Sequence, residues 1–227
     1  MSTDQNFTFP LGKYKYDNMN FGLCRILIPI VNGDLHKDMV YSDNVWDVLA
    51  TAAYAAYVQS KVFWPSGVKN ATLDHPANSV LAYYFPQSES GWDSGDLRAV
   101  SGGAGWHLSI NDLLKVMSTF RRKGTIMSSD KAQKMLDDKF GIDPTTTPAG
   151  TLYHKGGLWR TGSDKGVKIY AEVEQCVACF LPEDMCVVVC GVGCVVMEMA
   201  VFVNSYIGLP PKDLSNLVTD LYVDNLN

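Results

Sequence analysis

The chain has 227 residues, of which 47% are apolar and 19% are charged, and its formal net charge is -5. This length holds one sizeable hydrophobic core, and this composition excludes wholesale disorder. Because the acidic balance includes no basic block and no Lys/Arg stripe, nucleic acid is an unfavourable partner.

The N-terminus and one apolar segment bear on location. The first residues are polar and lack the basic region and apolar core of a signal peptide, so we expect a cytoplasmic protein. Residues 186–203 approach the length of a membrane-spanning helix and carry Glu198 as their charged residue. Gly191 and Gly193 divide this segment, which favours a buried strand running into a buried helix. We therefore expect no contact with a membrane.

Six cysteines occur in the chain, and five of them lie between Cys176 and Cys194. Cys176 and Cys179 are three residues apart, so on a strand they point to opposite faces, whereas a zinc site needs converging pairs. We expect buried free thiols in a reducing compartment, with no metal and no other cofactor.

Two helices are predicted in the first third of the chain. Asp17 or Asn18 caps a helix that Pro29 ends or kinks, and a turn at residues 32–34 closes the unit. A second helix covers residues 45–61, with a capping residue just before it and a proline–glycine turn after it.

The sequence in the middle of the chain predicts a long irregular segment followed by a capped helix. Residues 70–96 show no helical period, and within them residues 80–85 have the composition of a strand. Ser109 and Asp112 form the pattern of a capping box, which opens a helix that stops before Gly124.

The last third predicts strands followed by a helix. A short helix follows residues 128–130, and residues 153–155 are typical of the end of a strand. Residues 167–180 and 185–190 supply two more strands of a three-strand antiparallel meander. An amphipathic helix over residues 195–206 is expected to pack on this sheet. Helices, then strands, then a helix predict an α+β fold.

Gly156 and Gly157 follow the first of these strands and are candidates for a binding site. A glycine pair at the edge of an antiparallel sheet can leave backbone N–H groups for a ligand carbonyl or oxyanion. A glycine pair in a loop without a ligand explains the sequence equally well.

Four motifs occur in a recognisable order. Residues 10–18 run from a Pro-Leu-Gly turn into Tyr-Asp-Asn, and residues 57–68 run from a helix into a Trp-Pro-Ser-Gly turn. Residues 102–113 join a glycine-rich turn to a helix start, and His154-Lys155-Gly156 lies on the predicted strand. In this order the motifs resemble the serine β-lactamase and penicillin-binding-protein-like family, in the branch of class C β-lactamases, D-alanyl-D-alanine peptidases and related esterases. The resemblance covers the C-terminal two thirds of the family's fold.

The resemblance implies an acyl-transfer site. In the family a serine of a Ser-x-x-Lys motif is acylated while the lysine and a tyrosine move protons. Carried over, Tyr16 would be the general base, Asn18 would position the substrate and the lysine, and His154 would be a polar partner of Tyr16 or of the substrate. The substrate and oxyanion side would consist of Lys155, Gly156 and Gly157. An aromatic residue packed in the core is the alternative role for Tyr16.

The chain departs from the family at the nucleophile. The family's Ser-x-x-Lys lies well before Tyr-x-Asn, and the fifteen residues that precede Tyr16 contain no such motif. Ser66 and Ser128 begin chance matches, one in a turn and one at the start of a surface helix. Lys155 stands where the family has threonine, which changes the recognition of a substrate carboxylate.

These observations leave three readings. The chain is a β-lactamase-like relative that is inactive alone, an active serine hydrolase with an atypical or partner-supplied serine, or a ligand-binding or interaction module that uses the residual cleft.

The domain expected from the resemblance is a single truncated β-lactamase-like domain. Residues 1–149 would be mainly helix and loop, residues 150–206 antiparallel strands with a packing helix, and residues 207–227 a tail. Without the rest of the fold, the sheet around residues 167–180 would expose an edge or an apolar face. We therefore expect self-association or a complementing chain, with a small acyl substrate or ligand as a further partner.

Overall fold

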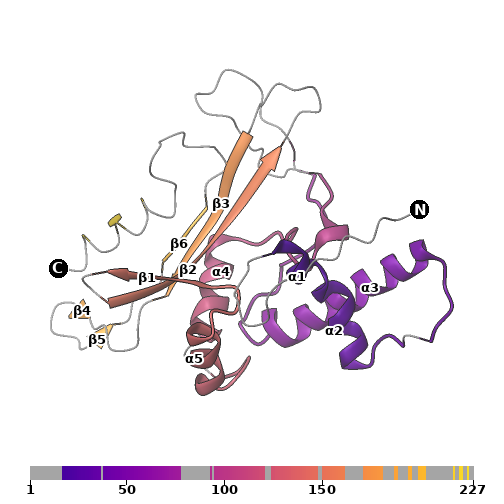
Figure 1. Ribbon diagram of the computed structural model, residues 1–227, viewed down its shortest axis with the longest axis horizontal. Coiled ribbons are helices and arrows are strands. Elements are labelled where there is room, and N and C mark those ends of the chain that lie inside the picture. The colour runs from indigo at the N-terminus through magenta and orange to yellow at the C-terminus, as the bar shows by residue number, and fades with distance from the viewer. Residues whose placement is uncertain are drawn as a thin grey trace, which may run out of the picture.

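The chain folds into a helical region followed by an antiparallel sheet, which is an α+β arrangement (Figure 1). The computed structural model describes residues 17–36, 38–77, 93, 95–120, 124–147, 150–161, 171–180, 187–188, 194–195, 199–202, 217, 220–221 and 224. The predicted fold class is therefore confirmed.

Helices α1 (Asn18–Gly22) and α2 (Cys24–Asn32) form the first unit. The Asp17 carboxylate caps α1 by accepting a hydrogen bond from the Met19 N–H at 2.9 Å. Helix α2 continues through Pro29 and ends at Gly33, whose φ of 83° is the left-handed conformation that glycine adopts readily. The predicted cap and the predicted turn are confirmed, but Pro29 does not end the helix.

Helix α3 (Asp43–Val58) continues into a π-helical turn, η1 (Gln59–Phe63), close to the predicted bounds. The turn brings Phe63 into a buried cluster with Val68 and Ala71. Trp106 packs on this cluster, and its ring meets the Phe63 ring nearly edge-on with centroids 4.8 Å apart. The turn that ends the helix therefore also helps to build the core of the helical region.

A short 3₁₀ helix, η2 (Arg98–Val100), precedes helices α4 (Ile110–Ser118) and α5 (Ser129–Asp137). The N–H of Asp112 donates to the Ser109 hydroxyl at 3.1 Å, so the predicted cap of α4 is confirmed. The short helix predicted after residues 128–130 is α5.

Four strands form the main sheet in the order β1-β2-β3-β6. They are β1 (Asp143–Thr147), β2 (Gly150–Thr161), β3 (Ala171–Phe180) and β6 (Met199–Val201), and all neighbours are antiparallel. The β2–β3 ladder shifts register between Gly157 and Leu158, where Gln175 has no partner, as in a β-bulge. Two further short strands, β4 (Val187–Val188) and β5 (Cys194–Val195), pair only with each other among the described residues.

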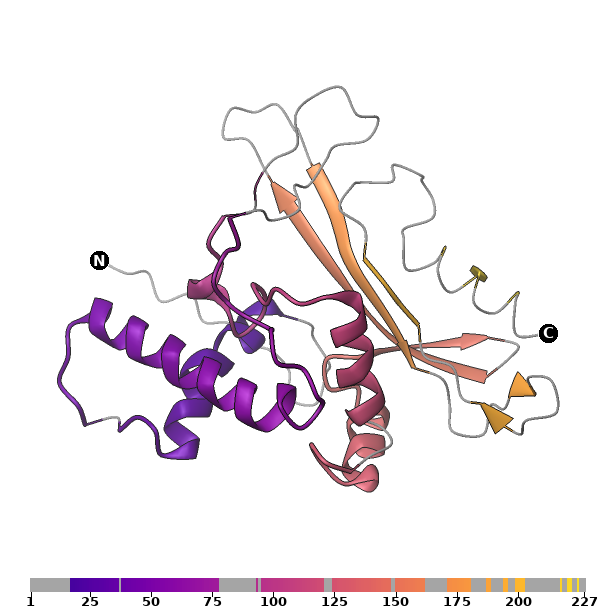
Figure 2. The ribbon, with the colours of Figure 1, turned by 180° about the vertical axis from the view of Figure 1, so that it is seen from behind.

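Helix α4 joins the two halves of the molecule, and both ribbon views draw it between the sheet and helices α1 to α3 (Figure 2). Met117 packs with Ala200 of β6 and with Tyr153 of β2, which places α4 against one face of the sheet. The next residue back, Val116, packs on the Phe63 cluster of the helical region. One helix therefore contributes to both cores.

Two predictions about the C-terminal part are wrong. Residues 195–206 were expected to form a helix, but residues 199–201 are strand β6, which pairs with β3. Residues 185–190 were expected to be the third strand of the meander, but their described part is β4, outside the main sheet. The edge of β3 accounts for the strand at residues 199–201, because its backbone groups pair with this short apolar segment.

The strand predicted at residues 80–85 lies outside the described residues. Among the described residues, no helix has both the length and the apolar character needed to cross a membrane.

Candidate functional site

The β1–β2 hairpin anchors the two polar residues that precede the glycine pair. Nε2 of His154 lies 2.8 Å from the Thr145 hydroxyl oxygen, and Asp143 is the cross-strand partner of His154. The Lys155 ammonium lies 3.7 Å from a carboxylate oxygen of Asp143, and both side chains are partly exposed. An ion pair of this length and exposure contributes little stability. The histidine, in contrast, is half-buried and its ring orientation is fixed by a short contact.

Gly156 and Gly157 lie inside β2, not at its end. The strand was expected to finish near Lys155, but it runs on to Thr161 and pairs with β3 along this part. On the other side, β1 pairs with residues 150–154 and stops there. Neighbouring residues of an antiparallel strand direct their N–H and C=O groups to opposite edges. One of the two glycines therefore directs its backbone groups to the edge where no described strand pairs.

The oxyanion side that the sequence predicts would lie at this edge. A backbone N–H at an unpaired position can donate to a ligand carbonyl or to an oxyanion. The bulge begins directly after Gly157, and bulges bend a strand and redirect its groups. The glycine pair was expected at the edge of the sheet, but it lies in the inner strand β2, beyond the residues that β1 pairs with. Its role in binding an oxyanion stays a prediction.

Helix α1 lies beside the same end of the hairpin. A Cβ at Gly141 would be 3.1 Å from the Phe21 ring, so the ring packs directly on the chain before β1. Gly141 precedes Asp143 by two residues, which span about 7 Å at most. Asn18 begins α1, one turn before Phe21. Helix α1 therefore packs on the chain two residues before β1.

The predicted approach of Tyr16 and Asn18 to His154 stays a prediction. Tyr16 and the side chain of Asn18 lie outside the described residues.

The two chance Ser-x-x-Lys matches lie in different surroundings. Ser66 is buried, and its hydroxyl donates to the Val62 carbonyl at 2.7 Å, in the turn that follows η1. Ser128 is the exposed N-cap residue of α5. A nucleophilic serine needs a nearby base and access to substrate. Ser66 lacks access, which makes it a poor candidate.

A second polar cluster was not predicted from the sequence. Nε2 of His75 lies 2.8 Å from the Asp93 carboxylate, and the rings of His75 and His107 meet at a centroid distance of 5.5 Å. Burial lowers the pKa of His107, and the neighbouring His75 lowers it further. The pKa of Asp93 is lowered by the Gly95 N–H and then by His75.

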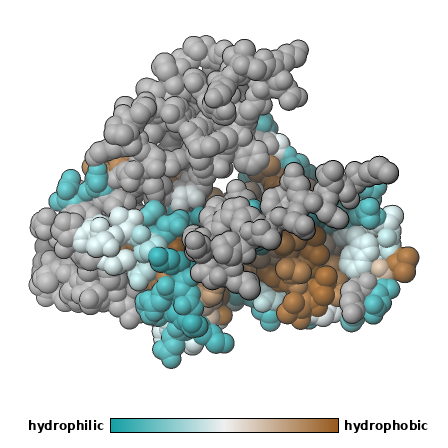
Figure 3. Space-filling model, in the orientation of Figure 1, coloured by the Kyte–Doolittle hydropathy of each residue, from teal (hydrophilic) through white to brown (hydrophobic). Residues whose placement is uncertain are grey.

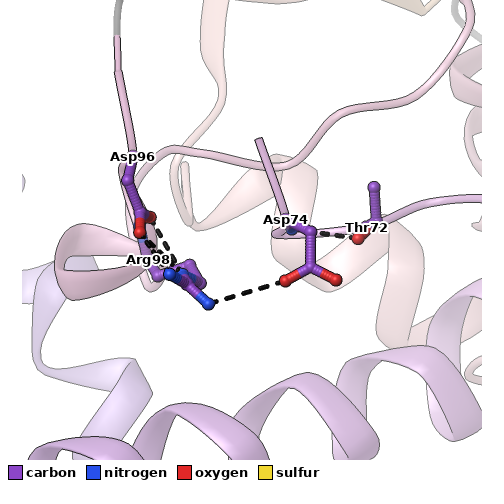
Figure 4. Close-up of polar contacts among 4 residues, drawn as sticks. All are labelled: Thr72, Asp74, Asp96 and Arg98. Atoms are coloured by element: carbon purple, nitrogen blue, oxygen red, sulfur yellow. Dashed lines mark hydrogen bonds and ion pairs between the residues drawn. The ribbon is translucent and has the colours of Figure 1, made fainter. Parts of the chain in front are cut away.

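Arg98, Asp96 and Asp74 form a further polar group, whose contacts Figure 4 shows. Nε of Arg98 donates to both carboxylate oxygens of Asp96, at 3.0 and 2.8 Å, and Nη1 lies 3.6 Å from Asp74. The pKa of Asp96 is lowered to about 2, mainly by the Arg98 side chain. Asp74 is itself held in a turn, because its N–H donates to the Thr72 hydroxyl at 2.9 Å. These contacts organise the surface but bring no nucleophile to the histidines.

Among the described residues, no group of three or more His, Cys, Asp or Glu side chains is arranged to hold a metal ion. Comparison with models of known protein families, with curated proteins and with solved structures finds no match for the chain.

Proposed function

We propose that these 227 residues belong to a β-lactamase-like serine hydrolase relative and are catalytically silent by themselves. The supporting observation is the position of Gly156 and Gly157 on β2, just beyond the end of β1 and two residues after His154, whose Nε2 contacts the Thr145 hydroxyl. Helix α1 packs on Gly141, two residues before the hairpin begins. The chain carries no Ser-x-x-Lys motif before Tyr16, so the attacking hydroxyl is the missing part.

In this proposal each residue keeps a defined role. The unpaired edge at Gly156 and Gly157 binds an acyl oxygen, and His154 donates to or accepts from the ligand or Tyr16. Lys155 is partly exposed and places a positive charge beside the glycine pair, where it would attract a ligand carboxylate. The fixed elements bind and orient an acyl group, but no covalent step takes place without a nucleophile.

A fluorophosphonate probe and a fluorescent penicillin test the silence of the chain. We expect no stoichiometric labelling of the full chain, because Ser66 is buried and Ser128 lies on the surface with no base assigned to it. Labelling near one mole per mole, mapped to one serine by mass spectrometry, would refute silence and establish the second reading, an active hydrolase. A serine supplied by a partner would give labelling of the partner chain only in the mixture.

The open strand edge also favours the third reading, a ligand-binding module, which is tested independently of covalent chemistry. Phenylacetylglycine, an acyl amino acid, is titrated into the ¹⁵N-labelled chain. We expect weak binding with shifts at the Gly156 and Gly157 amides, reduced in the Gly157→Pro variant. Shifts of equal size in that variant would place the ligand elsewhere.

Self-association through the sheet is part of the proposal. Strand β6 covers β3 only over residues 177–179, so residues 171–176 pair with β2 alone among the described strands. An unpaired edge of this kind invites another chain. A monodisperse monomer in light scattering at high concentration would contradict this expectation.

A further inference from the structure

Helices α1 and α2 carry a row of exposed apolar side chains. Met19, Leu23, Leu27 and Val31 recur every four residues, and Leu27 and Val31 are 51% and 87% exposed. The Leu23 and Leu27 N–H groups bond to the carbonyls four residues back at 2.9 Å, so the row stays on one helical face across the α1–α2 junction. Ile26 is also exposed beside it. We call these five residues the α2 stripe.

The stripe faces away from the rest of the helical region. Arg25, on the same helix, is largely buried and contacts Asp47 and Thr51 of α3 at 2.6 and 2.9 Å. At 3.6 residues per turn, Leu23 and Leu27 lie about 160° from Arg25 around the helix. Figure 3 accordingly shows apolar atoms gathered over α2. The α2 stripe therefore exposes apolar side chains to water. Contiguous apolar surface of this kind often marks an interaction site.

Acidic groups flank the stripe along the chain. Exposed Asp17 and Asp34 stand at its two ends, and exposed Asp38 and Asp43 follow in the next segment. Residues 17–58 contain five aspartates, at 17, 34, 38, 43 and 47, against two cations, Arg25 and Lys37. Arg25 is already committed to Asp47. Asp17 and Asp34 thus place negative charge at both ends of the stripe.

We propose that the α2 stripe is a docking site for an amphipathic helix of another protein whose apolar face is flanked by lysines and arginines. The stripe spans twelve residue steps, about 18 Å, which matches three to four turns of a partner helix. Its apolar row supplies the buried contact, and its aspartates select a basic partner. This proposal does not depend on the hydrolase proposal.

The same charges disfavour other occupants. In a symmetric antiparallel pair of α2 helices, Asp17 of one copy would approach Asp34 of the other, and like charges repel. An anionic lipid surface would be repelled for the same reason. A short helix that packs on one exposed helical face buries little area, so we expect a transient complex.

Two synthetic peptides test the proposal on the full chain. Both are 18-residue amphipathic helices with the same leucine face, one with lysine and arginine at the polar positions and one with glutamate. Fluorescence anisotropy should show saturable binding of the basic peptide, weakened by added salt, and at least tenfold weaker binding of the acidic peptide. Equal binding of both peptides would overturn the proposed selectivity.

Variants locate the site. The double variant Leu27→Ser with Val31→Ser should weaken binding of the basic peptide at least tenfold, because these exposed side chains supply the contact. Phe202→Ser, which changes an exposed side chain next to β6, should leave binding unchanged. Circular dichroism checks that both variants fold. If the double variant binds as well as the parent chain, the site is elsewhere and the proposal fails.

Light scattering and vesicle sedimentation examine the rival occupants. We expect no α2-dependent dimer and no binding to vesicles of phosphatidylserine and phosphatidylcholine. A dimer that the double variant abolishes would make a second copy the occupant, and vesicle binding that the variant abolishes would make the occupant a membrane. Either result would replace the proposed partner.

Discussion

Helices α4 and α2 have similar lengths and similar proportions of apolar residues, but they use them in opposite ways. In α4, Leu113, Leu114 and Met117 pack against the sheet and the hairpin. In α2, Leu27 and Val31 point into solvent. An amphipathic pattern predicts that a helix has an apolar face, but it does not predict whether the chain itself covers that face. Helix α4 covers one face of the sheet with its apolar side chains, whereas the apolar side chains of α2 remain exposed.

The largest expected effect separates these two faces. Met117 is 3% exposed, so Met117→Ala should lower the free energy of unfolding by about 2–5 kcal/mol through lost burial and a cavity. Leu27→Ala, on the α2 stripe, should change it by less than about 0.5 kcal/mol. Urea unfolding followed by circular dichroism measures both. Similar losses in both variants would mean that α2 is covered in solution.

The packing of the segment after η2 on helix α1 is tested at a glycine. A Cβ at Gly102 would lie 2.2 Å from the Phe21 carbonyl oxygen and 2.8 Å from that of Gly22. Gly102→Ala should therefore destabilise the chain by about 1–3 kcal/mol through overpacking.

The matched control for this change is Gly22→Ala, because a Cβ at Gly22 meets nothing within 4 Å. Alanine has the better helix propensity, so this variant should raise the stability by up to about 1 kcal/mol. Equal signs for the two variants in urea unfolding would argue against the close packing of residue 102 on α1.

A smaller effect distinguishes the two helix starts beside the sheet. Ser109→Ala removes the side-chain bond to the Asp112 N–H and should cost about 1 kcal/mol. Ser128 occupies the N-cap of α5 without such a bond, so Ser128→Ala should cost less. Thermal unfolding of the two variants gives the comparison, which fails if Ser128→Ala is the more harmful.

The smallest effect is the pH dependence of the exposed ion pair. The folded-state pKa of Asp96 is about 2, below the value of roughly 3.9 for an unfolded aspartate. The pair therefore stabilises the fold at pH values above about 4, and its contribution disappears as the pH falls through about 2. In Arg98→Gln, NMR titration should find the Asp96 pKa closer to its usual value, with a weaker pH dependence of stability in this window. An unchanged titration would contradict the role of Arg98.

Local signals explain which elements could be predicted. Asp17 and Ser109 cap their helices through bonds to residues two and three positions ahead, so the sequence alone reveals both starts. Strand β1 was missed, because Asp143-Pro-Thr-Thr-Thr has no apolar alternation and forms only through pairing with β2. Residues 199–203 are all apolar, so their sequence did not distinguish helix from strand, and pairing with β3 makes residues 199–201 a strand.

Part of the candidate site could also be predicted from local sequence. The glycine pair was recognised because adjacent glycines are a local pattern, but its position inside β2 was not predicted. The contact between His75 and Asp93 was not, because eighteen residues separate them and no spacing rule links them. The meeting of Tyr16 and His154 remains a prediction, supported by the packing of Phe21 on Gly141.

The bulge in the β2–β3 ladder bears on how this sheet tolerates changes in chain length. Removing one residue from the middle of a paired strand normally shifts every later pair and exchanges the two faces of the strand. Here Gln175 is the extra residue of the bulge, because Gly157 pairs with Cys176 and Leu158 with Glu174. Deleting Gln175 would therefore keep all of these pairs and remove the bulge. The strand next to the candidate site therefore contains one position where the chain can be shortened while the pairing of its neighbours is kept.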